Sequence, residues 1–166
     1  MHDELTREDI KKMQAELDRL RAEMPAILEE VKRTRAFGDL SENFEYKAAK
    51  QAQNKNRSRS RYLEGMIKTA VIIDDRSSAD EVGLYDKVEI YIPEDDETQI
   101  IQVVTTVRCD PRKGLISKES PFGQTVLGKK VGDKFTVHVN DSYSYEAVIK
   151  SITKMKDDGS APLLEF

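Results

Sequence analysis

The sequence predicts an α+β protein, in which an N-terminal antiparallel α-helical coiled-coil hairpin precedes a small α+β domain. Three observations predict this class. Apolar residues recur at helical spacing in the first half, Gly38 interrupts that pattern, and later segments alternate like half-buried strands. We therefore expect a helical arm over residues 1–74 and a globular domain over residues 75–166.

The first helix is expected from Thr6 to Arg35, with a length of about 45 Å at about 1.5 Å per residue. Thr6, followed three residues later by Asp9, offers an N-cap. Pro25 should kink or locally loosen the helix. An apolar stripe repeats with steps of three and four residues, as in coiled coils. It consists of Ile10, Met13, Leu17, Leu20, Met24, Ile27 and Val31.

The second helix is expected over about residues 40–70. A glycine-containing turn at Gly38 favours an antiparallel hairpin within one chain. The alternative is a homodimeric coiled coil; the hairpin instead predicts a monomer. Between Lys50 and Arg61 the only apolar residue is Ala52. The outer part of the arm should therefore pack loosely.

The second half contains strand-like and turn-like segments. A short helix should begin at Ser120 and Pro121, which read as N-cap and first helical residue, and end near Gly128. The residues from about 154 onward are rich in Asp, Gly, Ser and Pro, and we expect a mobile tail there. The expected strands cover residues 87–92, 99–104, 134–139 and 145–152.

Composition limits the function classes. The chain has 38% hydrophobic and 35% charged residues and a net charge of −4, so a protein that coats nucleic acid is disfavoured. One cysteine, Cys109, excludes an internal disulfide and a thiolate metal cluster. No phosphate loop, nucleophile elbow or His-rich motif is present, so a free-standing enzyme is not expected. The charged N-terminal segment and the lack of long apolar runs predict a soluble, cytoplasmic protein.

The segment after Gly38 holds the main candidate site. Asp39 and Glu42 are three residues apart, so a helix would place both carboxylates on one side. Carboxylate pairs bind Mg²⁺, which keeps several waters, so another molecule would have to complete this site. The alternative is a capping box, in which the same two side chains cap the second helix.

A basic stripe is the second candidate. Residues 46–63 contain six basic side chains and no acidic one, and the end of the first helix adds further cations. Such segregation of charge favours contact with an RNA backbone or an acidic protein channel. An ordinary solvated helix face is the alternative. The basic residues are Lys47, Lys50, Lys55, Arg57, Arg59 and Arg61, together with Lys32, Arg33 and Arg35.

Three segments carry a resemblance to a known family. Residues 38–46, Gly-Asp-Leu-Ser-Glu-Asn-Phe-Glu-Tyr, resemble the signature loop of the GreA/GreB transcript-cleavage factors. Residues 63–74 resemble the crossing from arm to globular domain, and residues 116–133 resemble a third family segment. The resemblance runs in order over about residues 6–153.

This resemblance implies an FKBP-like globular domain, an arm that enters the secondary channel of bacterial RNA polymerase, and cleavage of the backtracked RNA 3′ end. Asp39 and Glu42 would help hold a second Mg²⁺ there, so that the factor stimulates the polymerase's own hydrolysis. Supporting polar groups at the tip would be Ser41, Asn43, Glu45 and Tyr46. Contacts with RNA or the channel would come from Arg35, Lys47, Lys50 and Arg57. We also attach DNA binding to the resemblance as an expectation.

Two other functions remain open. Phe37 and Phe44 make the tip apolar and Ser41 stands where GreA proteins usually have lysine, which leaves room for a non-cleaving regulator in the same channel. An FKBP-like domain alone would also fit a prolyl isomerase or chaperone. Such pockets are normally lined by aromatic residues, which residues 75–153 hold in small number.

Overall fold

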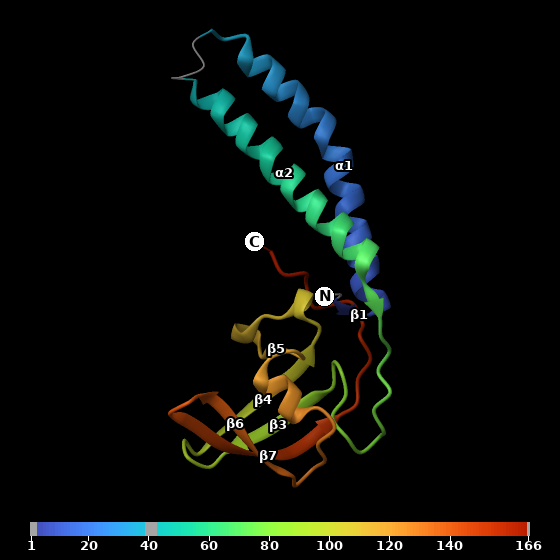
Figure 1. Ribbon diagram of the computed structural model, residues 1–166, viewed down its shortest axis with the longest axis vertical. Coiled ribbons are helices and arrows are strands. Elements are labelled where there is room, and N and C mark those ends of the chain that lie inside the picture. The colour runs from blue at the N-terminus through green and yellow to red at the C-terminus, as the bar shows by residue number, and fades with distance from the viewer. Residues whose placement is uncertain (1–2, 39–42, 166) are drawn as a thin grey trace. The chain divides into compact units, whose positions relative to one another are not determined.

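The structure is a computed structural model that describes residues 3–38 and 43–165 (Figure 1). It divides into two compact units, one built mainly from Ile10–Val71 and the other from Glu4–Asp9 and Ile72–Phe166. Over the described ranges, no helix combines the length and apolarity needed to span a membrane.

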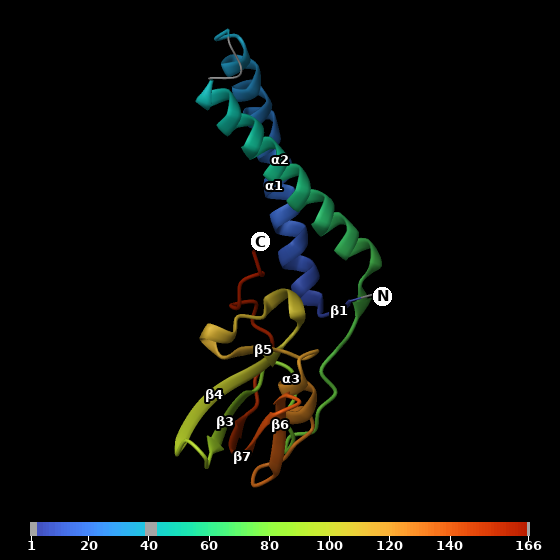
Figure 2. The same ribbon diagram turned by 60° about the vertical axis from the view of Figure 1, so that its left-hand side comes forward.

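The first unit is a hairpin of α1, Arg7–Arg35, and α2, Phe44–Thr69. The two helices run side by side in opposite directions (Figures 1 and 2). Of the apolar stripe on α1, Met13, Leu17 and Leu20 are buried, which confirms the predicted packing face. Pro25 is exposed and lies inside the uninterrupted helix, although its missing N–H removes one helical hydrogen bond.

The facing side of α2 is polar in its middle. Its buried residues are Ala49, Gln53, Asn56, Arg59 and Leu63, whereas Ala52 is exposed. Asn56 Nδ2 donates a hydrogen bond of 2.9 Å to the carbonyl oxygen of Leu20. Arg59 Nε donates to Glu16 Oε1 at 2.7 Å. Hydrogen-bonded polar side chains thus occupy the positions that apolar residues usually fill, and how tightly the outer arm packs stays a prediction. Such layers fix the register of a coiled coil.

The first turn of α1 belongs to the second unit and carries the predicted cap. The backbone N–H of Thr6 donates to Asp9 Oδ2 at 2.8 Å, and the N–H of Asp9 donates to Thr6 Oγ1 at 3.2 Å. Next to it, β1 (Glu4–Leu5) pairs with β2 (Val71–Ile72), a small sheet that the sequence did not predict. The N–H of Ile73 continues this pairing with a bond of 2.9 Å to the Leu5 carbonyl.

A five-stranded sheet in the order β5-β4-β3-β7-β6 forms the second unit (Figure 1). Its strands are β3 (Lys87–Ile92), β4 (Glu97–Val104), β5 (Leu115–Ser117), β6 (Lys134–Asn140) and β7 (Tyr143–Thr153). β5 lies parallel to β4, and the other pairs are antiparallel. The four predicted strands are confirmed; the short β5 was missed.

Helix α3 (Pro121–Val126) packs beside β6 (Figure 2). Ser120 caps it by accepting from the N–H of Gly123, as predicted. A Cβ at position 123 would lie 2.2 Å from the carbonyl oxygen of Ser117, so only glycine fits this close approach. The phenyl rings of Phe122 and Phe135 meet edge to face, 5.9 Å apart, and join helix to sheet. Two short 3₁₀ turns, Thr106–Arg108 and Pro111–Lys113, link β4 to β5.

The segment after residue 153, for which we expect mobility, makes polar contacts with other parts of the second unit. Met155 N–H donates to Asp86 Oδ1 at 2.8 Å. The carboxylate of Asp157 pairs with Arg108, which is fully buried. The N–H of Leu164 bonds to the carbonyl oxygen of Val107 at 2.6 Å. The composition of this segment does not reveal these contacts, and its mobility stays a prediction.

Candidate functional site

The described tip of the arm consists of two segments. Residues 35–38 lie where α1 ends, and residues 43–46 lie where α2 begins. Gly38 has φ of 103°, a left-handed conformation that favours glycine where the chain leaves the helix. Asp39, Ser41 and Glu42, the predicted metal ligands and one predicted support, lie outside the described residues. Their roles stay predictions.

Asn43 connects the ends of both helices. Its Oδ1 accepts from the N–H of Tyr46 at 2.9 Å and so caps α2. Its Nδ2 donates to the carbonyl oxygen of Thr34 at 2.7 Å, in the last turn of α1. The second helix therefore starts at Phe44 and not near residue 40 as predicted, while the capping box of Asp39 and Glu42 lies outside the described residues. Asn43 supplies the α2 cap, so that neither Asp39 nor Glu42 is needed for it.

We expect Asn43→Ala to weaken the arm by about 1–2 kcal/mol, because the cap acceptor and the cross-hairpin donor are lost together. Thermal unfolding of the full chain, followed by circular dichroism at 222 nm, measures this loss. Asn43→Asp is the matched control, since it keeps the acceptor for Tyr46 and removes the donor to Thr34. An unchanged melting curve for Asn43→Ala would contradict this role.

An ion-pair cluster lies beside the cap. Arg33 bonds to Glu30 through Nε at 2.9 Å and reaches Glu45 of α2 at 3.4 Å. The hydrogen bond to Glu30 raises the pKa of Arg33, and the same bond lowers the pKa of Glu30. Glu45 was predicted as tip support, and the structure shows that it helps to join the helix ends. Arg33 was not predicted in this role, although its spacing of three residues from Glu30 is typical of such pairs.

The basic stripe is partly as predicted. Lys47, Lys50, Arg57 and Arg61 follow steps of three, seven and four residues, so they share one side of α2. Arg59 does not belong to it, because it points into the helix interface and pairs with Glu16. Among the predicted contact residues, Arg35, Lys47 and Arg57 are exposed, and Lys50 is half-buried with Nζ 3.0 Å from Gln53 Oε1. These exposed cations can hold an anionic chain along the outer face of α2.

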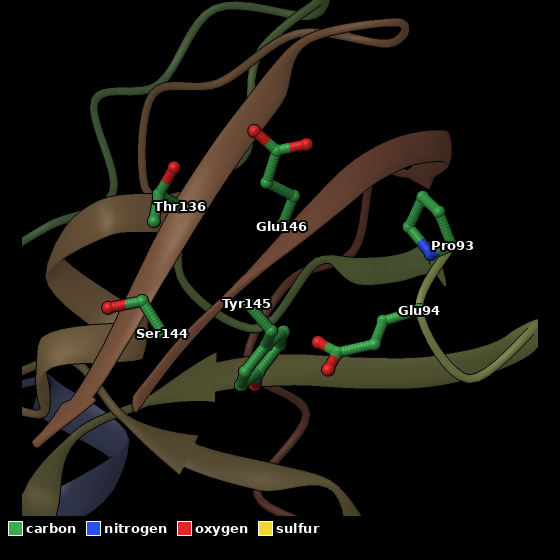
Figure 3. A pocket seen from close by; sticks show the side chains of 6 residues that line it. All are labelled: Pro93, Glu94, Thr136, Ser144, Tyr145 and Glu146. Carbon is green, nitrogen blue, oxygen red and sulfur yellow. The ribbon is translucent and has the colours of Figure 1, made fainter. Parts of the chain in front are cut away.

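The second unit has a shallow pocket of about 270 Å³ between the β3–β4 turn and strands β6 and β7. Figure 3 shows the carboxylate of Glu94 beside the ring of Tyr145, with Glu146 also on the lining. Burial raises the pKa of Tyr145. A small-molecule site is usually larger and mostly apolar. The lining residues therefore give the isomerase alternative no support.

Two family models match consecutive parts of the chain. Residues 4–72 match the model described as "Transcription elongation factor, N-terminal", and residues 77–154 match "Transcription elongation factor, GreA/GreB, C-term". The chain belongs to the GreA/GreB family of transcription elongation factors. The arm and the sheet domain thus correspond to the two matched parts of a GreA/GreB protein.

Relatives named transcription elongation factor GreA are similar over most of their length. The Mesoplasma florum protein is 39% identical over 145 residues, which is 86% of this chain and 93% of the relative. The Thermoanaerobacter pseudethanolicus protein is 41% identical over 137 residues, which is 81% of this chain and 87% of the relative. These relatives make the chain a GreA-family factor. Their names concern transcription elongation and give no support to DNA binding, so that expectation is dropped.

Solved structures are also similar. A structure of the transcription factor Gfh1 has 25% identity and a TM-score of 0.45, covering 92% of this chain and 97% of that one. The Thermus thermophilus GreA factor homolog 1 (Gfh1) has 24% identity and a TM-score of 0.43, covering 93% of this chain and 100% of that one.

Proposed function

We propose that this GreA-family factor inserts its arm into the secondary channel of bacterial RNA polymerase and stimulates the polymerase to cleave backtracked RNA. The observation that carries the proposal is a long helical hairpin whose tip segment, 38–46, bears the family's acidic sequence and whose α2 bears exposed cations. With 29 residues, α1 is about 44 Å long at 1.5 Å per residue, which gives the tip the reach to enter a deep channel.

Asp39 and Glu42 are the proposed Mg²⁺ ligands. Two carboxylates are hard oxygen donors of the type that Mg²⁺ prefers, and they leave room for ligands from a second molecule. Among the described residues there is no group of three or more side chains that could hold a metal ion. A shared ion at the polymerase active site fits this donor set better than a site completed by the factor alone.

When bound, such an ion supplies Lewis-acid activation of water and stabilisation of the leaving oxygen. The chain's own contribution is positioning. Asn43 and Arg33 join the last turn of α1 to the first turn of α2, the two helix ends that flank the acidic pair in the sequence. Lys47, Lys50 and Arg57, with Arg35 from α1, hold the RNA backbone or the channel wall. Ser41, Glu45 and Tyr46 support the tip. The protein acts as a monomer and forms no active site by itself.

RNA cleavage in a purified, backtracked polymerase complex tests this proposal. With Mg²⁺ present, we expect added factor to shorten the RNA, and we expect no shortening when EDTA removes the metal. Polymerase binding is measured in the same samples. Binding without cleavage would contradict the proposal and favour a non-cleaving regulator that occupies the same channel.

A further inference from the structure

Two phenylalanine side chains next to the tip face solvent. Phe37 is 57% exposed and Phe44 is 80% exposed. Each ring has a cation beside it: Arg33 Cζ lies 5.2 Å from the centroid of Phe37, and Lys47 Nζ lies 5.6 Å from that of Phe44. Single exposed apolar residues are common on proteins. Two aromatic–cation pairs at the same end of a hairpin form a distinct surface, which we name the aromatic tip pairs.

Phe44 has a defined place at the start of a capped helix. Phe44 is the first residue of α2, directly after the Asn43 cap. Lys47 stands one turn further along the helix, is exposed, and forms no ion pair with another residue that the structure describes. Arg33, in contrast, is tied to Glu30 and Glu45. The Phe44–Lys47 pair therefore places an exposed ammonium group beside an aromatic ring that is largely open to solvent.

We propose that Phe44 stacks on a nucleobase of the extruded RNA 3′ segment while Lys47 contacts the neighbouring phosphate. Phe37 with Arg33 provides a second, weaker contact. This inference rests on the proposed function, since it names the groups that would receive the RNA beside the acidic tip.

The chemistry of the pair favours RNA over an apolar protein pocket. A single-stranded nucleic acid presents a flat base and a negative phosphate in alternation, and proteins bind it with aromatic faces and nearby cations. An apolar protein pocket could cover the phenyl ring, but it would also have to desolvate the ammonium group of Lys47, which is costly. The half-buried Lys50 and the exposed Arg57 continue along α2 and match the backbone that follows the base.

Fluorescence of 2-aminopurine, placed at the 3′ nucleotide of the RNA in a backtracked complex, tests the stacking. An Asp39→Asn/Glu42→Gln background keeps the RNA uncut during the measurement. We expect the factor to quench the fluorescence. Phe44→Ala and Phe44→Leu should lose the quenching and weaken binding to the backtracked complex by at least about fivefold, and Phe44→Trp should retain both. Because Phe44 is exposed, none of these changes removes a core contact.

The outcomes separate this inference from the proposed function. If wild type cleaves RNA but neither it nor the background variant quenches the probe, stacking is excluded and the cleavage role stands. Quenching that depends on Phe44, without any cleavage by wild type, would support stacking and exclude the cleavage role. If Phe44→Ala and Phe44→Leu weaken binding to RNA-free polymerase equally, Phe44 contacts the protein and the inference is wrong.

Discussion

The double change Asp39→Ala/Glu42→Ala is expected to lower the rate of RNA cleavage by at least about 100-fold. Loss of a residue that only hydrogen-bonds to a metal ligand already lowers activity by up to about 100-fold, and here the proposed ligands themselves are removed. Both carboxylates would be lost, and with them the proposed ligands of the shared Mg²⁺. The rate of RNA shortening in a backtracked polymerase complex measures the effect. Affinity for the polymerase should stay within about threefold of wild type, since the rest of the arm is unchanged.

The structure supplies the control that this experiment needs. Since Asn43 makes the α2 cap, the double variant should keep the helix content and melting temperature of the wild type. Asn43→Ala, in contrast, should lower stability while the acidic pair remains. If the double variant unfolds the arm, the two carboxylates are structural. If it cleaves at the wild-type rate, other groups provide the metal ligands.

The helices and strands with a regular apolar pattern could be predicted from sequence. Met13, Leu17 and Leu20 repeat at the spacing of a buried helix stripe, and the cap of α3 follows from Ser120 and Pro121. The polar side of α2 could not be predicted in this way. Hydropathy alone cannot distinguish a polar residue that is buried with a partner from one in solvent. Their spacing could have indicated burial. Residues 49, 53, 56, 59 and 63 are three or four positions apart, so they lie on the same side of the helix as the apolar Leu63.

The candidate site shows the same limit. The acidic pair and the basic stripe were proposed from residue type and position, and the role of the pair stays a prediction. Arg59 was assigned to the stripe although it is buried against Glu16. Residue type also failed to show that Asn43 joins the two helix ends, because its partner Thr34 lies nine positions away. Long-range pairs of this kind leave no periodic trace in the sequence.

A buried charge cluster in the second unit is another case of long-range pairing. Arg108 is 1% exposed, and its Nη1 pairs with Asp157 and with Asp9 Oδ1, the latter at 3.3 Å. These partners lie 49 and 99 positions away. Its Nε donates to the carbonyl oxygen of Ala161 at 2.9 Å, and its Cζ lies 4.7 Å from the ring centroid of Tyr85. Burial opposes the charged form, but the hydrogen bond to Asp157 helps to raise the pKa of Arg108 overall.

We expect Arg108→Ala to lower the free energy of unfolding by about 3–5 kcal/mol, because Asp9 would remain buried without its countercharge. Urea unfolding, followed by intrinsic tyrosine fluorescence and by circular dichroism, measures the loss. Arg108→Lys should recover only part of it, since an ammonium group cannot reproduce the planar set of donors. Asp157 should then no longer hold the C-terminal segment.

The double change Asp9→Asn/Arg108→Met separates pairing from packing. It removes the charges of Asp9 and Arg108 and leaves only Asp157 without its partner, while it keeps a side chain of similar length at position 108. The double change should therefore cost less than Arg108→Ala alone. Asp9→Asn also keeps an acceptor for the N–H of Thr6, which preserves the cap of α1. If the double variant is as unstable as Arg108→Ala, packing against Tyr85 and Ala161, and not the countercharge, is what Arg108 contributes.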